Sequence, residues 1–144
     1  MDALQTALLV LSTLPGLGIQ SRELTAAALL DSQRQQQVLT AFSSGDPLQL
    51  HGWDTNGSAA RELRSFEAQD RAMQTADRCR RIGIDLIFRG SEAYPAGLTD
   101  LEHAPPVLYK RGAADALDIS LGWVAMVGSR RPTELGLRFA RRAA

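Results

Sequence analysis

The residues best suited to bind a ligand form a short loop near the C-terminal end of the chain, Gly128, Ser129, Arg130 and Arg131. The glycine lets the backbone approach a ligand closely, and the serine hydroxyl can donate a hydrogen bond. The two guanidinium groups add positive charge and paired donors that match the geometry of a phosphate or carboxylate. These residue types predict anion binding at the loop.

The elements that flank this loop would position it. The apolar run Trp123–Val127 reads as a buried strand of a parallel sheet, and Thr133 can cap a helix that carries Leu135 and Phe139 on one side. A strand, a tight glycine turn and a helix N-terminus together form the anion-binding corner of a Rossmann-like sheet. The loop lacks the glycine pattern of dinucleotide sites and the lysine of phosphate loops. An ordinary turn with solvated arginines is the alternative interpretation.

A second candidate lies near the N-terminus, in the glycine-rich turn Leu14–Gly18. Residues 2–13 carry leucines at helical spacing, and Ser21 can cap a following helix. This is the pattern of a helix-hairpin-helix motif, whose backbone amides can bind a DNA phosphate without reading bases. Gly16 and Gly18 are therefore possible DNA contacts. The alternative is a plain turn between two helices, in which the glycines only supply left-handed residues.

The rest of the chain predicts a mixed architecture. Asp31 or Ser32 can cap a third helix, residues 43–57 read as a loop, and Ser58–Ile82 reads as one long helix that Gly83 ends. We expect Trp53 to pack onto the helical layer, with stacking on a base as the alternative. Strands are predicted at residues 84–88 and 107–110, with a loop at 89–97 between them.

Composition narrows the class of protein. The chain has 144 residues with no net charge, but residues 101–144 carry seven basic and four acidic side chains, a net charge of +3. This third of the chain is the part suited to a polyanion. The single cysteine, Cys79, and two separated histidines make a metal site unexpected. We expect no cofactor, no membrane segment and a cytoplasmic setting.

Three ordered motifs resemble one known family. They are Tyr94-Pro95 with Leu98, then the run Pro105–Gly112, then Val124–Arg130 with Gly136. Their order and spacing are similar to those of the DprA/Smf family of DNA-processing proteins of natural transformation, and the N-terminal glycine turn fits that family too. The resemblance spans nearly the whole chain and is strongest from residue 94 to 136.

The resemblance implies a non-enzymatic protein that binds single-stranded DNA in a basic pocket. Such proteins protect incoming DNA, help load the RecA recombinase, and form a homodimer through the Rossmann domain. The glycine–serine–arginine loop lies at the DNA pocket in the family, so Gly128, Ser129 and Arg130 become candidate phosphate contacts, with Arg131 beside them. Leu135 departs from the family pattern, which often has a tyrosine at that position.

The predicted fold class is α+β overall. A small helical domain, SAM-like or helix-hairpin-helix, is expected at residues 1–82, and the truncated start of an extended Rossmann-like α/β domain at residues 83–144. A parallel sheet needs more strands than these residues supply, so we expect the chain to be the front part of a longer protein.

Two other classes of function stay open. One is an enzyme fragment similar to Rossmann-fold nucleotide phosphoribohydrolases, which also hold phosphates with glycines and an arginine at strand ends. The other is a module that only binds proteins, through residues 1–82. The leading helical domain and the Tyr-Pro and Pro-Pro motifs are not features of the enzyme class. No acid–base pair or nucleophile in the sequence argues independently for catalysis.

Overall fold

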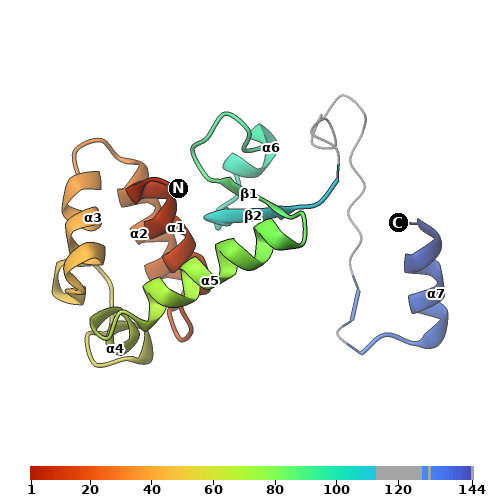
Figure 1. Ribbon diagram of the computed structural model, residues 1–144, viewed down its shortest axis with the longest axis horizontal. Helices are drawn as coiled ribbons and strands as arrows, with labels where there is room; N and C mark the ends of the chain where they lie inside the picture. The colour runs from red at the N-terminus through yellow and green to blue at the C-terminus, as the bar shows by residue number, and fades with distance from the viewer. Residues whose placement is uncertain (113–127, 130, 144) are drawn as a thin grey trace. The chain divides into compact units, whose positions relative to one another are not determined.

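A computed structural model of the protein describes residues 1–112, 128–129 and 131–143 (Figure 1). The chain divides into two compact units, Met1–Ala113 and Ala114–Ala144. The described part of the second unit holds one helix, α7 (Glu134–Ala143). The first unit contains α1 (Ala3–Thr13), α2 (Ile19–Leu30), α3 (Gln35–Ser44), η1 (Pro47–Gln49), α4 (Ser58–Arg64), α5 (Glu67–Arg81), β1 (Asp85–Phe88), α6 (Ala96–Thr99) and β2 (Val107–Lys110).

Helix α1 forms the centre of the first unit and confirms the helix predicted at residues 2–13. All five residues from Ala7 to Leu11 are buried, and α1 contacts α2, α3, α5 and β2. Its N-terminus begins with a capping box, in which the Gln5 N–H donates to Asp2 Oδ1 at 2.8 Å and the Asp2 N–H donates to Gln5 Oε1 at 3.1 Å. The cap satisfies two backbone donors that a helix start leaves open.

Trp53 packs onto the helical layer as predicted. Its ring meets Phe42 edge to face, with ring centroids 6.1 Å apart and an interplanar angle of 88°. The indole N–H donates to Thr25 Oγ1 at 2.8 Å, and both side chains are buried. A buried indole needs such a partner, because an unpaired N–H in an apolar core costs free energy.

The long helix predicted from Ser58 to Ile82 is wrong, since the structure breaks it into α4 and α5. Phe66 takes a left-handed conformation with φ of 61°, which ends the first helix and redirects the chain. A Cβ added at Gly45 would lie only 3.3 Å from Phe66 Cζ, so the glycine leaves room for the ring. Gly83, with φ of 69°, ends α5 as predicted.

Two predicted helix caps are also wrong. Helix α2 starts after Gly18 rather than after Ser21, whose hydroxyl instead donates to the Gly52 carbonyl at 2.5 Å. Helix α3 starts after Arg34, and Asp31 Oδ1 accepts the N–H groups of two residues in the preceding turn. Asp31 is used in the turn before α3, which competes for the same short polar residues. Ser21 lies within α2 and makes a tertiary contact to a residue 31 positions later in the chain.

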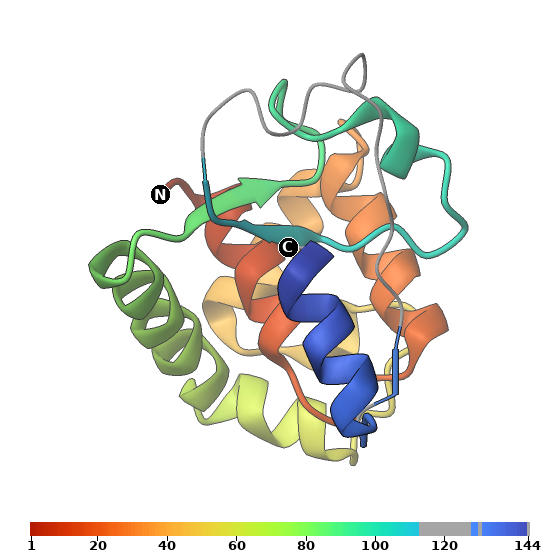
Figure 2. The ribbon, with the colours of Figure 1, turned by 90° about the vertical axis from the view of Figure 1, so that its right-hand side faces the viewer.

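Both strands predicted in the first unit are present and run side by side (Figures 1 and 2). β1 pairs with β2 in antiparallel register, from Asp85 opposite Lys110 to Phe88 opposite Val107. The short helix α6 lies between them in the chain and begins at Ala96, so the last two residues of the predicted loop 89–97 are helical instead. The architecture is therefore α+β, and the third predicted strand, Trp123–Val127, lies outside the described residues.

The strands lie in the same compact unit as the helices, because β1 contacts α5 and β2 contacts α1. Packing of this kind does not show which segment folds by itself. The division into domains at residues 1–82 and 83–144 therefore stays a prediction.

We predict that Trp53→Phe lowers the free energy of unfolding by roughly 1–2 kcal/mol, because it removes a buried hydrogen bond and part of the indole contact area. Urea denaturation would measure the loss. The control is the same substitution in a Thr25→Val background, where no acceptor remains and the loss should be smaller. An equal loss in both backgrounds would show that the hydrogen bond to Thr25 contributes nothing to stability.

Candidate nucleic-acid interface

The predicted anion loop is exposed where the structure describes it. Gly128, Ser129 and Arg131 are all exposed, and the Arg131 N–H donates to Ser129 Oγ at 3.1 Å. This bond folds the loop back on itself and leaves the serine O–H proton available to another acceptor. The fourth predicted contact, Arg130, lies outside the described residues.

The helix after the loop begins as predicted, with Thr133 as its cap. Thr133 Oγ1 accepts the Gly136 N–H at 3.2 Å, and the Thr133 carbonyl accepts the Leu137 N–H at 3.0 Å. The N–H groups of Glu134 and Leu135 precede the first intrahelical bond and have no acceptor within the helix. This end of α7 can attract an anion through its dipole, but the Glu134 carboxylate opposes a second negative charge there.

Positive charge dominates the described part of the second unit. It contains four basic residues and one acidic residue, which are Arg131, Arg138, Arg141 and Arg142 and, opposite in sign, Glu134. The four arginines are exposed. This arrangement agrees with the +3 charge of the C-terminal third and suits a polyanion more than a neutral ligand.

The N-terminal hairpin uses its two glycines differently. Gly16 has φ of +71°, and a Cβ added there would lie 2.0 Å from Ser58 Oγ. Gly18 has φ of −61° as the N-cap of α2, and an added Cβ would meet nothing within 4 Å. Of the two, only Gly16 is therefore required by backbone conformation and close packing.

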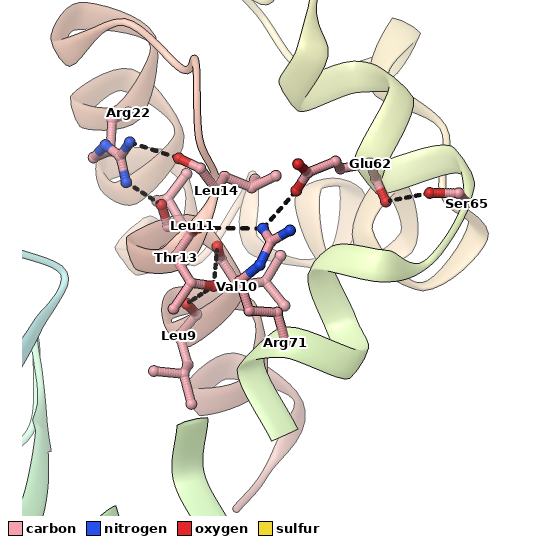
Figure 3. A network of polar contacts seen from close by, with 9 residues as sticks. All are labelled: Leu9, Val10, Leu11, Thr13, Leu14, Arg22, Glu62, Ser65 and Arg71. Atoms are coloured by element: carbon pink, nitrogen blue, oxygen red, sulfur yellow. Dashed lines mark hydrogen bonds and ion pairs between the residues drawn. The ribbon is translucent and has the colours of Figure 1, made fainter. Parts of the chain in front are cut away.

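The basic residue nearest the hairpin faces the protein. Arg22 donates from Nη1 to the Leu11 carbonyl and from Nη2 to the Leu14 carbonyl at 3.0 Å (Figure 3). Nη2 also lies 3.4 Å from the Leu17 carbonyl. Partial burial lowers the pKa of Arg22. Its donors cap the C-terminal end of α1 and the turn that follows, so they are not turned towards a phosphate at the hairpin.

A second arginine reaches the same end of α1 from α5. Arg71 Nη1 lies 3.5 Å from the Thr13 carbonyl and 2.5 Å from Glu62 Oε2 (Figure 3). The hydrogen bond to Glu62 raises the pKa of Arg71. Sequence analysis missed both roles, because an arginine that bonds carbonyls has the same local pattern as one that faces solvent.

The Tyr-Pro and Pro-Pro motifs form a carbonyl clamp, made of Arg89, Tyr94 and the segment Ala104–Pro106. The Arg89 side chain lies 3.4 Å from the Ala104 carbonyl, the Tyr94 hydroxyl donates to the Pro105 carbonyl at 2.8 Å, and the Arg89 N–H donates to the Pro106 carbonyl at 3.0 Å. Burial raises the pKa of Tyr94. The two adjacent prolines have no N–H to donate, so their backbone can form hydrogen bonds only through the carbonyls. These motif residues thus have a structural role.

Comparison with known proteins supports the resemblance. Residues 85–144 match the family model described as DNA recombination-mediator protein A. The resemblance to DprA/Smf proteins is therefore confirmed for this segment, which contains the clamp, β2 and the loop. No curated protein sequence and no solved structure matches the chain.

Neither a membrane span nor a metal cluster is found in the part of the chain that the structure describes. Among these residues, no helix is long and apolar enough to cross a bilayer. In the same residues, no group of three histidine, cysteine or acidic side chains is placed to hold a metal ion. Cys79 is a buried thiol on α5.

We predict that Gly16→Ala and Gly18→Ala differ clearly in stability. Gly16→Ala should lower the free energy of unfolding by roughly 1–2 kcal/mol, because a side chain is strained at positive φ. Gly18→Ala serves as the matched control and should cost less, on the order of a few tenths up to 1 kcal/mol for a poorer helix N-cap. Thermal unfolding of both variants would decide, and equal losses would contradict the assigned difference between the two glycines.

Proposed function

We propose that the protein acts in DNA recombination and processing, as a protein that binds single-stranded DNA. The match of residues 85–144 to the recombination-mediator family supports this most directly. The resemblance further implies protection of incoming DNA and loading of the RecA recombinase during natural transformation. Homodimer formation through the Rossmann domain and a cytoplasmic setting belong to the same proposal.

The proposal includes the finer description of the fold. Residues 1–82 would form a SAM-like or helix-hairpin-helix domain, which the helical layer and the turn around Gly16 support. Residues 83–144 would begin a Rossmann-like domain. The described strands of that segment, β1 and β2, are antiparallel, so a parallel sheet would have to be built from strands outside them.

The loop Gly128–Arg131 would supply the phosphate contacts. Ser129 Oγ accepts the Arg131 N–H and can still donate its own O–H, Arg131 is exposed, and Arg130 follows directly after the serine in sequence. Guanidinium and hydroxyl donors bind phosphate oxygens without reading bases, which suits a protein that must accept any incoming sequence. The basic face of α7 extends the positive charge beyond the loop.

The hairpin is the weaker of the two candidate contacts. Gly16 and Gly18 could still present backbone N–H groups to a phosphate. The guanidinium of Arg22, however, is hydrogen-bonded to carbonyls at the end of α1 and in the turn. A phosphate at the hairpin would therefore lack the cationic partner that usually accompanies one. We propose no catalytic step for either place.

We predict that Arg130→Ala and Arg131→Ala each weaken binding to single-stranded DNA, by about the same factor for oligonucleotides of different base composition. The plot of log affinity against log salt should flatten by roughly 0.7 for each phosphate contact that the substitution removes. Fluorescence anisotropy over a range of salt concentrations would measure both. Arg130 is expected to show the larger effect, because it follows the serine directly.

The matched control is Arg78→Ala, which removes one exposed arginine from α5 and changes the net charge equally. It should leave the slope nearly unchanged, since local contacts and not total charge carry the effect. An unchanged slope and affinity in both loop variants would remove the loop from the interface. A chain that binds no single-stranded DNA even at low salt would overturn the proposed function itself.

A further inference from the structure

A partly buried ion pair joins the strand segment to the helical layer. Arg89, the residue after β1, places Nη1 2.9 Å from Glu23 Oε1 and 3.0 Å from Oε2. The side chains are only 11% and 24% exposed, respectively. Glu23 lies on α2, sixty-six residues earlier in the chain. This pair therefore differs from the exposed pair between Asp77 and Arg80, which stays within α5.

The next residue makes a second contact on the same helix. Gly90 has φ of +87°, and a Cβ added there would lie 2.7 Å from Leu30 Cδ2. Leu30 follows Glu23 by seven residues, which is about two helical turns, so both lie on one face of α2. Arg89 and Gly90 thus contact the same face of α2, Arg89 through the ion pair and Gly90 through close packing.

Arg89 is also hydrogen-bonded to the segment that leads into β2. Through the carbonyl clamp it holds Ala104 with its side chain and Pro106 with its backbone N–H. The Arg89 Nε atom is buried and has no hydrogen-bond partner among the described residues. All of the hydrogen bonding of this guanidinium is therefore directed to Glu23 and the clamp, so removal of Glu23 would leave a poorly compensated charge.

We propose that the Glu23–Arg89 pair is a latch: it holds β1, β2 and the clamp against the helices, and its loss releases this segment while the helical layer stays folded. Apolar contacts from Phe88 and Val107 reach the same core, whose other buried members come from the helices and the segments that join them. The latch is independent of DNA binding, and so is its test.

The latch also bounds a groove. A groove of about 440 Å³ runs between α2 and β2, with Ile19, Arg22 and Glu23 on one side and Pro105, Pro106 and Tyr109 on the other. Glu23 lies on one wall and the segment Ala104–Pro106 on the other, and Arg89 is hydrogen-bonded to both. Release of the latch would open this groove and expose the apolar surface behind β2.

Native-state hydrogen exchange on the full chain tests the proposal. Ile87 and Leu108 are register partners two positions from the hydrogen bond between Arg89 and Pro106, so they exchange backbone hydrogen bonds. We expect Glu23→Gln to lower protection of these two amides by roughly tenfold or more, because a partly buried charge loses its partner. Protection of buried amides in α1 and α3 should change much less.

Two further variants keep the test decisive. Arg89→Met retains the aliphatic stem of the side chain. When it is combined with Glu23→Gln, the protection of Ile87 and Leu108 should fall no further than in the more affected single variant, because each single substitution already removes the ion pair. Arg80→Gln, which breaks the exposed pair on α5, is the matched control and should leave all protection unchanged. If Glu23→Gln lowers protection equally in strands and helices, or leaves the strands unaffected, the latch is overturned.

Discussion

Enclosure of α1 is the constraint on which the rest of the first unit depends. Leu8, Leu9 and Leu11 are completely buried, and Leu14 after the helix is nearly so. A helix that is apolar on all sides cannot lie on a surface and must be surrounded by other elements. Helices α2, α3 and α5 and strand β2 provide those surroundings, so their positions follow from the need to cover one helix.

Enclosure creates a second requirement at the C-terminal end of α1, where the last carbonyls have no intrahelical donor. Arg22 from α2 and Arg71 from α5 supply donors there, so the same bonds that satisfy the carbonyls also tie two neighbouring helices to α1. The first unit thus uses these arginines for its own architecture. In the described part of the second unit the arginines are exposed, and exposed guanidinium groups are the ones that can neutralise the phosphates of a polyanion.

Local patterns predicted the elements that depend on local causes. Patterns within a few residues identify the leucine helix α1, the apolar strands β1 and β2, the stop at Gly83 and the cap at Thr133. Features that depend on distant partners were missed. At the helix break the Phe66 ring lies beside Gly45, where an added Cβ would crowd it, and Arg89 pairs with the carboxylate of Glu23 on α2. Neither partner is visible from the residues around them.

The motifs that carry the family resemblance do not all carry function in the same way. Tyr94, Pro105 and Pro106 serve the clamp, whose task is to hold a proline segment that offers only carbonyls. The loop after Val127 has no such structural duty in the described residues, beyond the bond between Ser129 and Arg131. A shared clamp argues for a shared local fold, whereas a shared exposed loop argues for a shared ligand. The matched segment contains both, so the match supports the proposed role in DNA recombination, and the exposed loop with its charge supports the proposed contact with phosphate.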